Sequence, residues 1–115
     1  MGTKKRLLEL RYTGLGTAAA YDDVKSDRPQ PGEVWCIQNA AIENETNNFT
    51  ELRVFIEGRG YNHYLDEQDN PLAGHLFTLP RDVFIHENEM LVARFTGCTT
   101  GDKLAMYLSG YRQNE

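Results

Sequence analysis

Short segments of alternating apolar and polar residues constrain this chain more than any other feature of its sequence. The clearest segment is Leu52–Glu57, in which Leu52, Val54 and Ile56 share one face of an extended chain. Comparable segments recur at intervals of roughly 8 to 15 residues, separated by turn-forming residues, and no window of about a dozen residues carries the apolar stripe of an amphipathic helix. The pattern predicts an all-β chain.

The number of segments also predicts the architecture. About seven or eight short strands in one small domain must bury one face of each sheet against another sheet. We therefore expect a two-sheet antiparallel β-sandwich of jelly-roll type, with an immunoglobulin-like sandwich as the alternative. The 115 residues suffice for one core, which we place in a single domain over residues 7–115. Residues 1–6 are predicted to form a flexible N-terminal arm. The reason is that the sequence offers no packing partner for the three consecutive cations of this arm, Lys4, Lys5 and Arg6.

Three local patterns refine this expectation. Val34–Ile37 is apolar at every position, which predicts a central strand with Trp35 in the core. Gly58–Gly60 is typical of a tight hairpin turn between two strands. Met90–Phe95 and Leu104–Leu108 are predicted to form a closing hairpin.

Charge and cysteine content limit the partners and the compartment. Twelve Lys and Arg against seventeen Asp and Glu give a net charge of −5, which argues against a nucleic-acid partner. No apolar stretch approaches the roughly 18 residues that cross a bilayer, and the first residues lack the apolar region of a secretory signal. We therefore expect no membrane partner and synthesis in the cytoplasm. Cys36 and Cys98 fit neither a zinc ribbon nor a disulfide framework and are predicted to be free thiols.

The sequence contains no pattern typical of an enzyme or of a cofactor site. His63, His75 and His86 each lack a nearby metal-ligating partner, and no nucleophile elbow, P-loop or dinucleotide fingerprint is present. Asp66–Asn70 concentrates oxygen ligands in what the sequence predicts to be an exposed acidic loop, so a bound cation is an alternative there. We predict a non-enzymatic protein without metal or cofactor.

Phe55, Val92 and Tyr107 lie on strand faces opposite to those that fill the predicted core. Such side chains would be partly exposed in a monomer, and exposed apolar patches mark association surfaces. We therefore predict a homo-oligomer whose contacts include these three residues. The alternative is that the N-terminal strand or the Pro29–Pro31 loop covers some of them.

Tyr61, His63 and Tyr64 lie together on the predicted hairpin that follows Gly58–Gly60. Two roles are open for them: an aromatic platform for a sugar ring, or packing in a contact between subunits. Tyr61 and Tyr64 accordingly join the candidate interface.

Several stretches of the sequence carry a family resemblance. They are Pro31–Trp35, the polar turn Asn44–Thr50, and Glu89–Leu104 continued by Ser109–Tyr111. In these stretches the chain resembles small β-sandwich virion proteins of tailed bacteriophages, and capsid decoration (cement) proteins are nearest to it in size. The resemblance covers roughly residues 31–112.

The resemblance implies a function that the residues alone do not. It implies a homo-oligomer of the virion, commonly a trimer, that sits on the outside of the head and clamps neighbouring subunits of the major capsid protein. Lys4, Lys5 and Arg6 are then candidate anchors for an acidic capsid surface. A carbohydrate-binding or receptor-binding β-sandwich module is the alternative. The two differ in whether Tyr61 and Tyr64 are coplanar and exposed, or buried between subunits.

Overall fold

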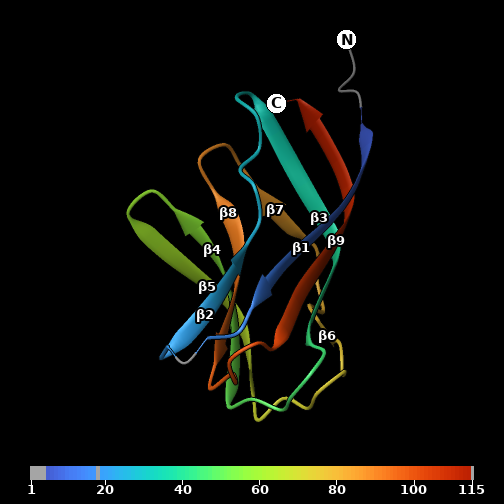
Figure 1. The fold of residues 1–115 in the computed structure, drawn as a ribbon. Helices are drawn as coiled ribbons and strands as arrows, with labels where there is room; N and C mark the ends of the chain where they lie inside the picture. Colours follow the sequence, from blue (N-terminus) through green and yellow to red (C-terminus); the bar gives the residue numbers. More distant parts are fainter. Residues whose placement is uncertain (1–4, 18, 115) are drawn as a thin grey trace.

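The computed structural model describes residues 5–17 and 19–114, and this part of the chain forms nine strands and no helix (Figure 1). One sheet contains β1 (Arg6–Leu15), β3 (Glu33–Asn44), β6 (Phe77–Thr78), β7 (Val83–Ile85) and β9 (Lys103–Asn114). The other contains β2 (Tyr21–Lys25), β4 (Glu51–Gly58), β5 (Tyr61–Asp69) and β8 (Met90–Thr96). Within the described residues there is consequently no helix that could cross a membrane.

The strand order is that of a jelly roll. The five-stranded sheet runs β1-β9-β3-β6, with β7 also paired to β3, and the four-stranded sheet runs β2-β8-β4-β5. Every pair is antiparallel. β1 pairs with β9, β2 with β8, β3 with β7, and β4 with β5 in the central hairpin. This is one long hairpin rolled into two sheets. The predicted jelly roll is confirmed, and the immunoglobulin-like order, which pairs the second strand with the fifth, is not observed.

The core lies between the two sheets and follows the alternation in the sequence. Leu52, Val54 and Ile56 on β4 pack into it together with residues from the facing sheet. Trp35 is buried as expected, and its indole N–H donates a hydrogen bond of 2.9 Å to Glu33 Oε1. The predicted hairpin turn at Gly58–Gly60 is also confirmed, because β4 and β5 pair on either side of it.

Two local predictions are wrong. Met90–Phe95 and Leu104–Leu108 do not form a hairpin, because β8 pairs with β2 and β4 whereas β9 pairs with β1 and β3. The connection between them changes sheets, which lets each strand take a central position in its own sheet. Asp66–Asp69 is not a loop either, since β5 continues through Asp69 as the outer partner of β4.

The buried carboxylate of Asp102 holds the connections at one end of the sandwich together. It accepts hydrogen bonds from Asn44 Nδ2 at 2.9 Å, from Asn47 Nδ2, and from the Thr99 amide at 2.8 Å. Burial raises the pKa of Asp102, but these hydrogen bonds outweigh it and leave the pKa below the ordinary value. Nearby, burial and the charge of Asp102 raise the pKa of the Cys98 thiol to about 11. Cys36 and Cys98 are both free, as predicted.

Replacing the core tryptophan tests the sandwich. Trp35→Ala is expected to lower the free energy of unfolding by roughly 3–5 kcal/mol, because the cavity between the sheets cannot collapse. Phe84→Ala on β7, half exposed on the outside of the same sheet, serves as the control and should cost less than about 1 kcal/mol. Thermal and denaturant melting measure both. Melting of Trp35→Ala at the wild-type temperature would contradict the placement.

Removing the charge of Asp102 tests the hydrogen-bond cluster. Asp102→Asn is expected to cost about 2–4 kcal/mol at neutral pH, because it replaces charge-assisted hydrogen bonds in a buried site. Since the folded-state pKa is lowered, the stabilisation is present above the unfolded value of about 4 and is lost as the pH falls through the folded value. Melting as a function of pH should therefore be flatter in acid for Asp102→Asn than for wild type. Asp69→Asn, at an exposed carboxylate, should keep the wild-type profile.

Candidate functional site

The outer face of the four-stranded sheet carries ordered rows of side chains. Residues directly opposite one another on neighbouring strands share a face, so the strand register defines these rows. One row is charged and consists of Asp23, Arg94, Arg53 and Glu67, from β2, β8, β4 and β5. The next row consists of Lys25, Val92, Phe55 and Tyr64 from the same four strands. The first row therefore brings two arginines side by side in the middle of the sheet.

Each arginine of the charged row is compensated by its own carboxylate. Arg94 binds Asp23 with both arms of its guanidinium, Nε to Oδ1 at 2.9 Å and Nη2 to Oδ2 at 3.1 Å. Arg53 Nε lies 3.0 Å from Glu51 Oε1 and 3.3 Å from Glu67 Oε2. The hydrogen bonds to Asp23 raise the pKa of Arg94. These pairs hold both arginines in place despite their mutual repulsion.

Phe55 and Val92 form an apolar floor beneath this charged layer. Their side chains are only 2% and 0% exposed, so the prediction that they lie partly exposed in a monomer is wrong. The covering groups also differ from those we expected. The Phe55 ring lies 5.1 Å from the Tyr64 ring and 5.1 Å from the guanidinium carbon of Arg94. The aliphatic and planar parts of charged residues can shield apolar groups in this way, a contribution that strand alternation does not reveal.

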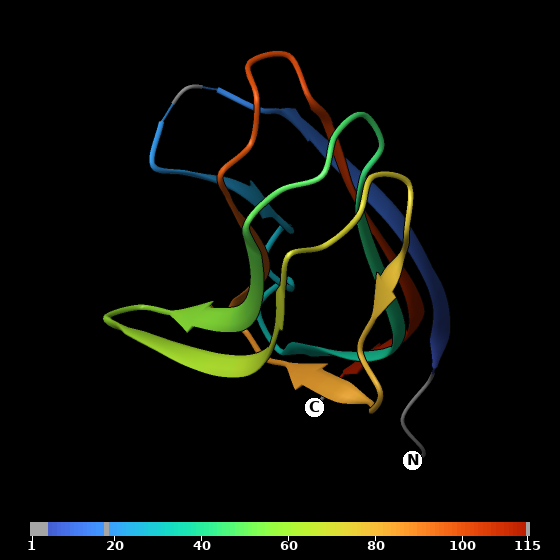
Figure 2. The ribbon, with the colours of Figure 1, turned by 90° about the horizontal axis from the view of Figure 1, so that it is seen from below.

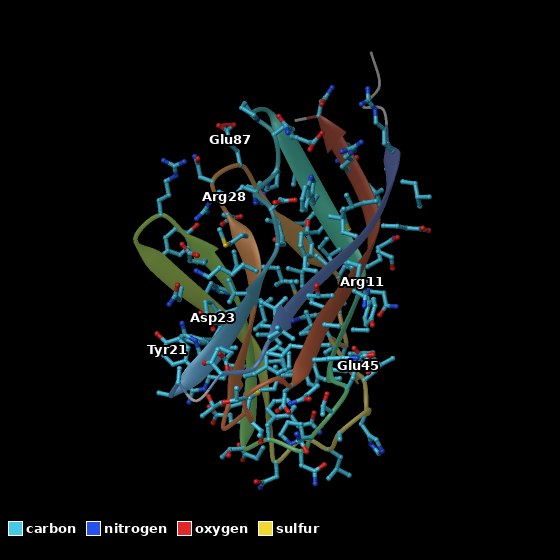
Figure 3. All side chains as sticks on the ribbon, in the orientation of Figure 1. Arg11, Tyr21, Asp23, Arg28, Glu45 and Glu87 are labelled. Atoms are coloured by element: carbon cyan, nitrogen blue, oxygen red, sulfur yellow. The ribbon has the colours of Figure 1, made fainter. Side chains whose placement is uncertain are left out.

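A groove of about 540 Å³ opens on this face. Its lining comes from all four strands and from the β4–β5 turn: Asp23, Lys25, Phe55, Glu57, Gly58, Gly60, Tyr61, Asn62, Val92 and Arg94. Figure 2 shows the β4–β5 hairpin projecting from the body of the sandwich, and Figure 3 shows Tyr21 and Asp23 on β2, on the side of that hairpin. Arg28, from the loop after β2, reaches this face and pairs with Glu57 at 3.2 Å. The groove thus combines an apolar floor with walls that carry both signs of charge.

The three exposed tyrosines near the groove do not form one platform. Tyr61 and Tyr64 are three positions apart on β5 and therefore point to opposite faces of the hairpin. Tyr64 packs on Phe55, whereas Tyr61 covers Gly58 and donates a hydrogen bond of 2.7 Å to Glu89 Oε2, which raises the pKa of Tyr61. The third, Tyr21, lies under the Arg94 guanidinium at 3.9 Å. Tyr61 and Tyr64 are about half exposed, on opposite faces of β5.

Tyr107 is separated from Phe55 and Val92. It lies on β9, on the outside of the five-stranded sheet, where the Arg11 guanidinium is 5.7 Å from its ring. Phe55 and Val92 lie on the outside of the other sheet. The three residues therefore cannot belong to one continuous patch of a single molecule, because the hairpin that would have joined their strands does not exist.

The N-terminal cations are attached to the five-stranded sheet from Lys5 onward, and Lys4 lies outside the described residues. Lys5 Nζ is 4.5 Å from the centre of the Tyr111 ring. Arg6 is the first residue of β1 and pairs with Arg112, so the strand takes in the last residue of the predicted arm.

The acidic segment does not gather a cation site. Asp66, Glu67 and Asp69 alternate between the two faces of β5, and Glu67 is paired with Arg53. The described part of the chain contains no group of three or more His, Cys, Asp or Glu side chains that could hold a metal ion.

Comparison with known proteins gives no family for this chain. No family model matches it, and no curated protein matches it. Two solved structures with a similar fold come from infectious bursal disease virus. A chain of the Gt strain structure matches with a TM-score of 0.43 and 7% identity, and a chain of the Gx strain structure with 0.40 and 13%. Each match covers 96% of this chain but only 32% of the viral chain. The assignment of the jelly roll rests on the strand order and not on these matches.

The position of Phe55 leads to a test that separates the two outer faces. Phe55→Ala is expected to lower the free energy of unfolding by about 2–4 kcal/mol, because the ring is buried under Tyr64 and Arg94. Tyr107→Ala on the opposite sheet should cost less than about 1.5 kcal/mol, because its ring is only half-buried. Denaturant melting measures both values. Equal, small losses would show that Phe55 is not a structural part of the groove.

Proposed function

We propose that this chain is a non-enzymatic structural protein of a virion, a capsid decoration protein that binds the outer surface of the head and stabilises it. The observation that carries the proposal is the groove on the four-stranded sheet, in which Asp23, Arg94 and Glu57 are held in ion pairs around a buried apolar floor. A surface ordered in this way loses little conformational entropy when a partner binds. The location in the virion and synthesis in the host cytoplasm follow from the proposal.

A protein partner fits the groove better than a small reactive substrate. Its walls carry two positive side chains, Lys25 and Arg94, and two negative ones, Asp23 and Glu57. An extended segment of the major capsid protein that carries charges of both signs can pair with such walls, and mismatched segments meet like charges. Lys4, Lys5 and Arg6 are proposed as a second contact, to an acidic region of the capsid. The trimer implied by the resemblance stays a prediction.

A carbohydrate-binding or receptor-binding module is the second candidate, and Tyr61 is the observation that favours it. Tyr61 is 54% exposed and lines the groove. A sugar ring bound by stacking needs a free aromatic face. Of the three tyrosines, Tyr61 is the one that lines the groove, which makes it the principal stacking group of a sugar site.

Cosedimentation with empty capsids of the virus whose genome encodes the chain tests the first candidate. Lys25→Glu and Asn62→Arg change exposed residues of the groove and are each expected to weaken capsid binding by about tenfold or more. Lys103→Glu, the same charge reversal on the other sheet, is the matched control and should bind as wild type does. Failure of the wild-type chain to sediment with capsids would refute the decoration role.

A further variant tests the second candidate. Tyr61→Ala should abolish the retention of the chain on immobilised host-surface polysaccharide if the groove holds a sugar. Retention that survives Tyr61→Ala would exclude the sugar site.

A further inference from the structure

The free backbone edge of β1 is a feature that the proposed function does not use beyond Arg6 at its beginning. β1 is the terminal strand of the five-stranded sheet and pairs with β9 over ten consecutive residues without a break in register (Figure 1). Among the residues that the structure describes, β1 has no strand on its other side. Every second residue of β1 therefore directs its N–H and C=O groups away from the sheet.

Other edges of the molecule have features that block the addition of a strand, and β1 lacks them. β5, the edge of the four-stranded sheet, has a register shift opposite Val54 and Phe55 and carries three carboxylates, Asp66, Glu67 and Asp69. β2 has five residues, and β6 and β7 have two and three. β1 contains no proline and no register shift, and between Leu8 and Tyr12 its core-facing side carries no charged residue. A long, regular edge of this kind is a template for strand pairing.

The two faces of β1 differ in a way that suits pairing with itself. Leu8 is buried in the core, and Leu10 and Tyr12, on the same face, are half-buried at the margin of the sandwich. The outer face carries Leu7, Glu9 and Arg11. All three are exposed, and Leu7 is 75% exposed. The opposite charges of Glu9 and Arg11 flank Leu10 symmetrically.

We propose that β1 pairs antiparallel with β1 of a second copy of this chain, in the register that places Leu10 opposite Leu10. In this register Glu9 lies opposite Arg11 of the second copy, and by symmetry Arg11 lies opposite its Glu9. Leu8 lies opposite Tyr12 of the second copy on the core-facing side. Both contacts are of the kind that stabilises antiparallel strand pairs. The antiparallel arrangement makes the contact a two-fold dimer.

Neighbouring registers are disfavoured by charge and by burial. A shift of two positions in one direction places Glu9 opposite Glu9, and a shift in the other direction places Arg11 opposite Arg11. Like charges directly opposite one another destabilise strand pairs. In a register shifted by an odd number of positions, core-facing residues of one copy lie opposite solvent-facing residues of the other. The half-buried Leu10 and Tyr12 would then be exposed. The side chains of β1 thus select one register.

The dimer would extend the five-stranded sheet across the two-fold axis and leave the groove of each copy free on the other sheet. The inference therefore goes beyond the proposed function and does not depend on it. Failure of the dimer would not affect capsid binding through the groove, and failure of capsid binding would not affect the dimer.

Sedimentation equilibrium of the full chain over a range of concentrations tests the proposal with two single charge reversals. Glu9→Arg and Arg11→Glu each create like-charge pairs in the dimer and should raise the dimer dissociation constant by about tenfold. An equimolar mixture of the two variants should regain wild-type association as a heterodimer, because each reversed charge then faces its opposite. Lys103→Glu on β9, one strand inside the edge, is the matched control and should associate as wild type does.

Recovery in the mixture cannot arise from misfolding, and melting curves of the single variants provide a separate check of the fold. A wild-type chain that stays monomeric up to roughly 0.5 mM would overturn the proposal. An oligomer of any size whose mass is the same for wild type and both reversals would also overturn it, because the contact would then lie elsewhere. A dimer that weakens in both single variants and recovers in their mixture would confirm the edge and its register.

Discussion

The buried carboxylate of Asp102 and the connections around it are the constraint on which the rest of the structure depends. Three of the connections that carry the chain from one sheet to the other meet there. Asp102 binds Asn44, the last residue of β3, and Asn47 in the connection that follows. Its own carbonyl accepts a hydrogen bond of 2.8 Å from the Gly16 amide after β1, and Thr99 and Gly101 belong to the connection after β8. A Cβ at Gly16 would lie 2.6 Å from the Thr99 carbonyl oxygen, so only glycine fits this approach. The crossings fix which strand enters which sheet, and hence which residues share a face.

The groove depends on this assignment of strands. Because β2 and β8 are neighbours in the four-stranded sheet, Asp23 stands beside Arg94, and the pair covers Phe55 on β4. Two guanidiniums side by side on one face repel each other, which destabilises the sheet. The ion pairs of Arg94 and Arg53 with carboxylates offset this repulsion. The face therefore presents paired charges of both signs around Phe55.

The two sheets expose different kinds of surface. Edge strand β5 of the four-stranded sheet has a register shift and carboxylates, and the proposed binding site of that sheet lies on its face. Edge strand β1 of the five-stranded sheet is long and regular, and the proposed contact of that sheet lies along this edge. A face can bind a different protein through side chains, whereas an edge offers backbone groups that another strand can pair with. A decoration protein with both could join a copy of itself and a capsid subunit at the same time.

The sequence by itself determined the class of the fold and the core. Alternation at Leu52, Val54 and Ile56, and the apolar run around Trp35, identified buried faces correctly because burial against a second sheet is a local demand on every other residue. The tertiary structure alone decided which strands are neighbours, since β8 and β9 are close in sequence yet belong to different sheets. For that reason Phe55 and Tyr107, which look alike in the sequence, lie on opposite outer faces, and the ion pair of Asp23 with Arg94 could not be foreseen. Periodicity reports on which face of a strand a residue lies; only long-range pairing decides what covers that face.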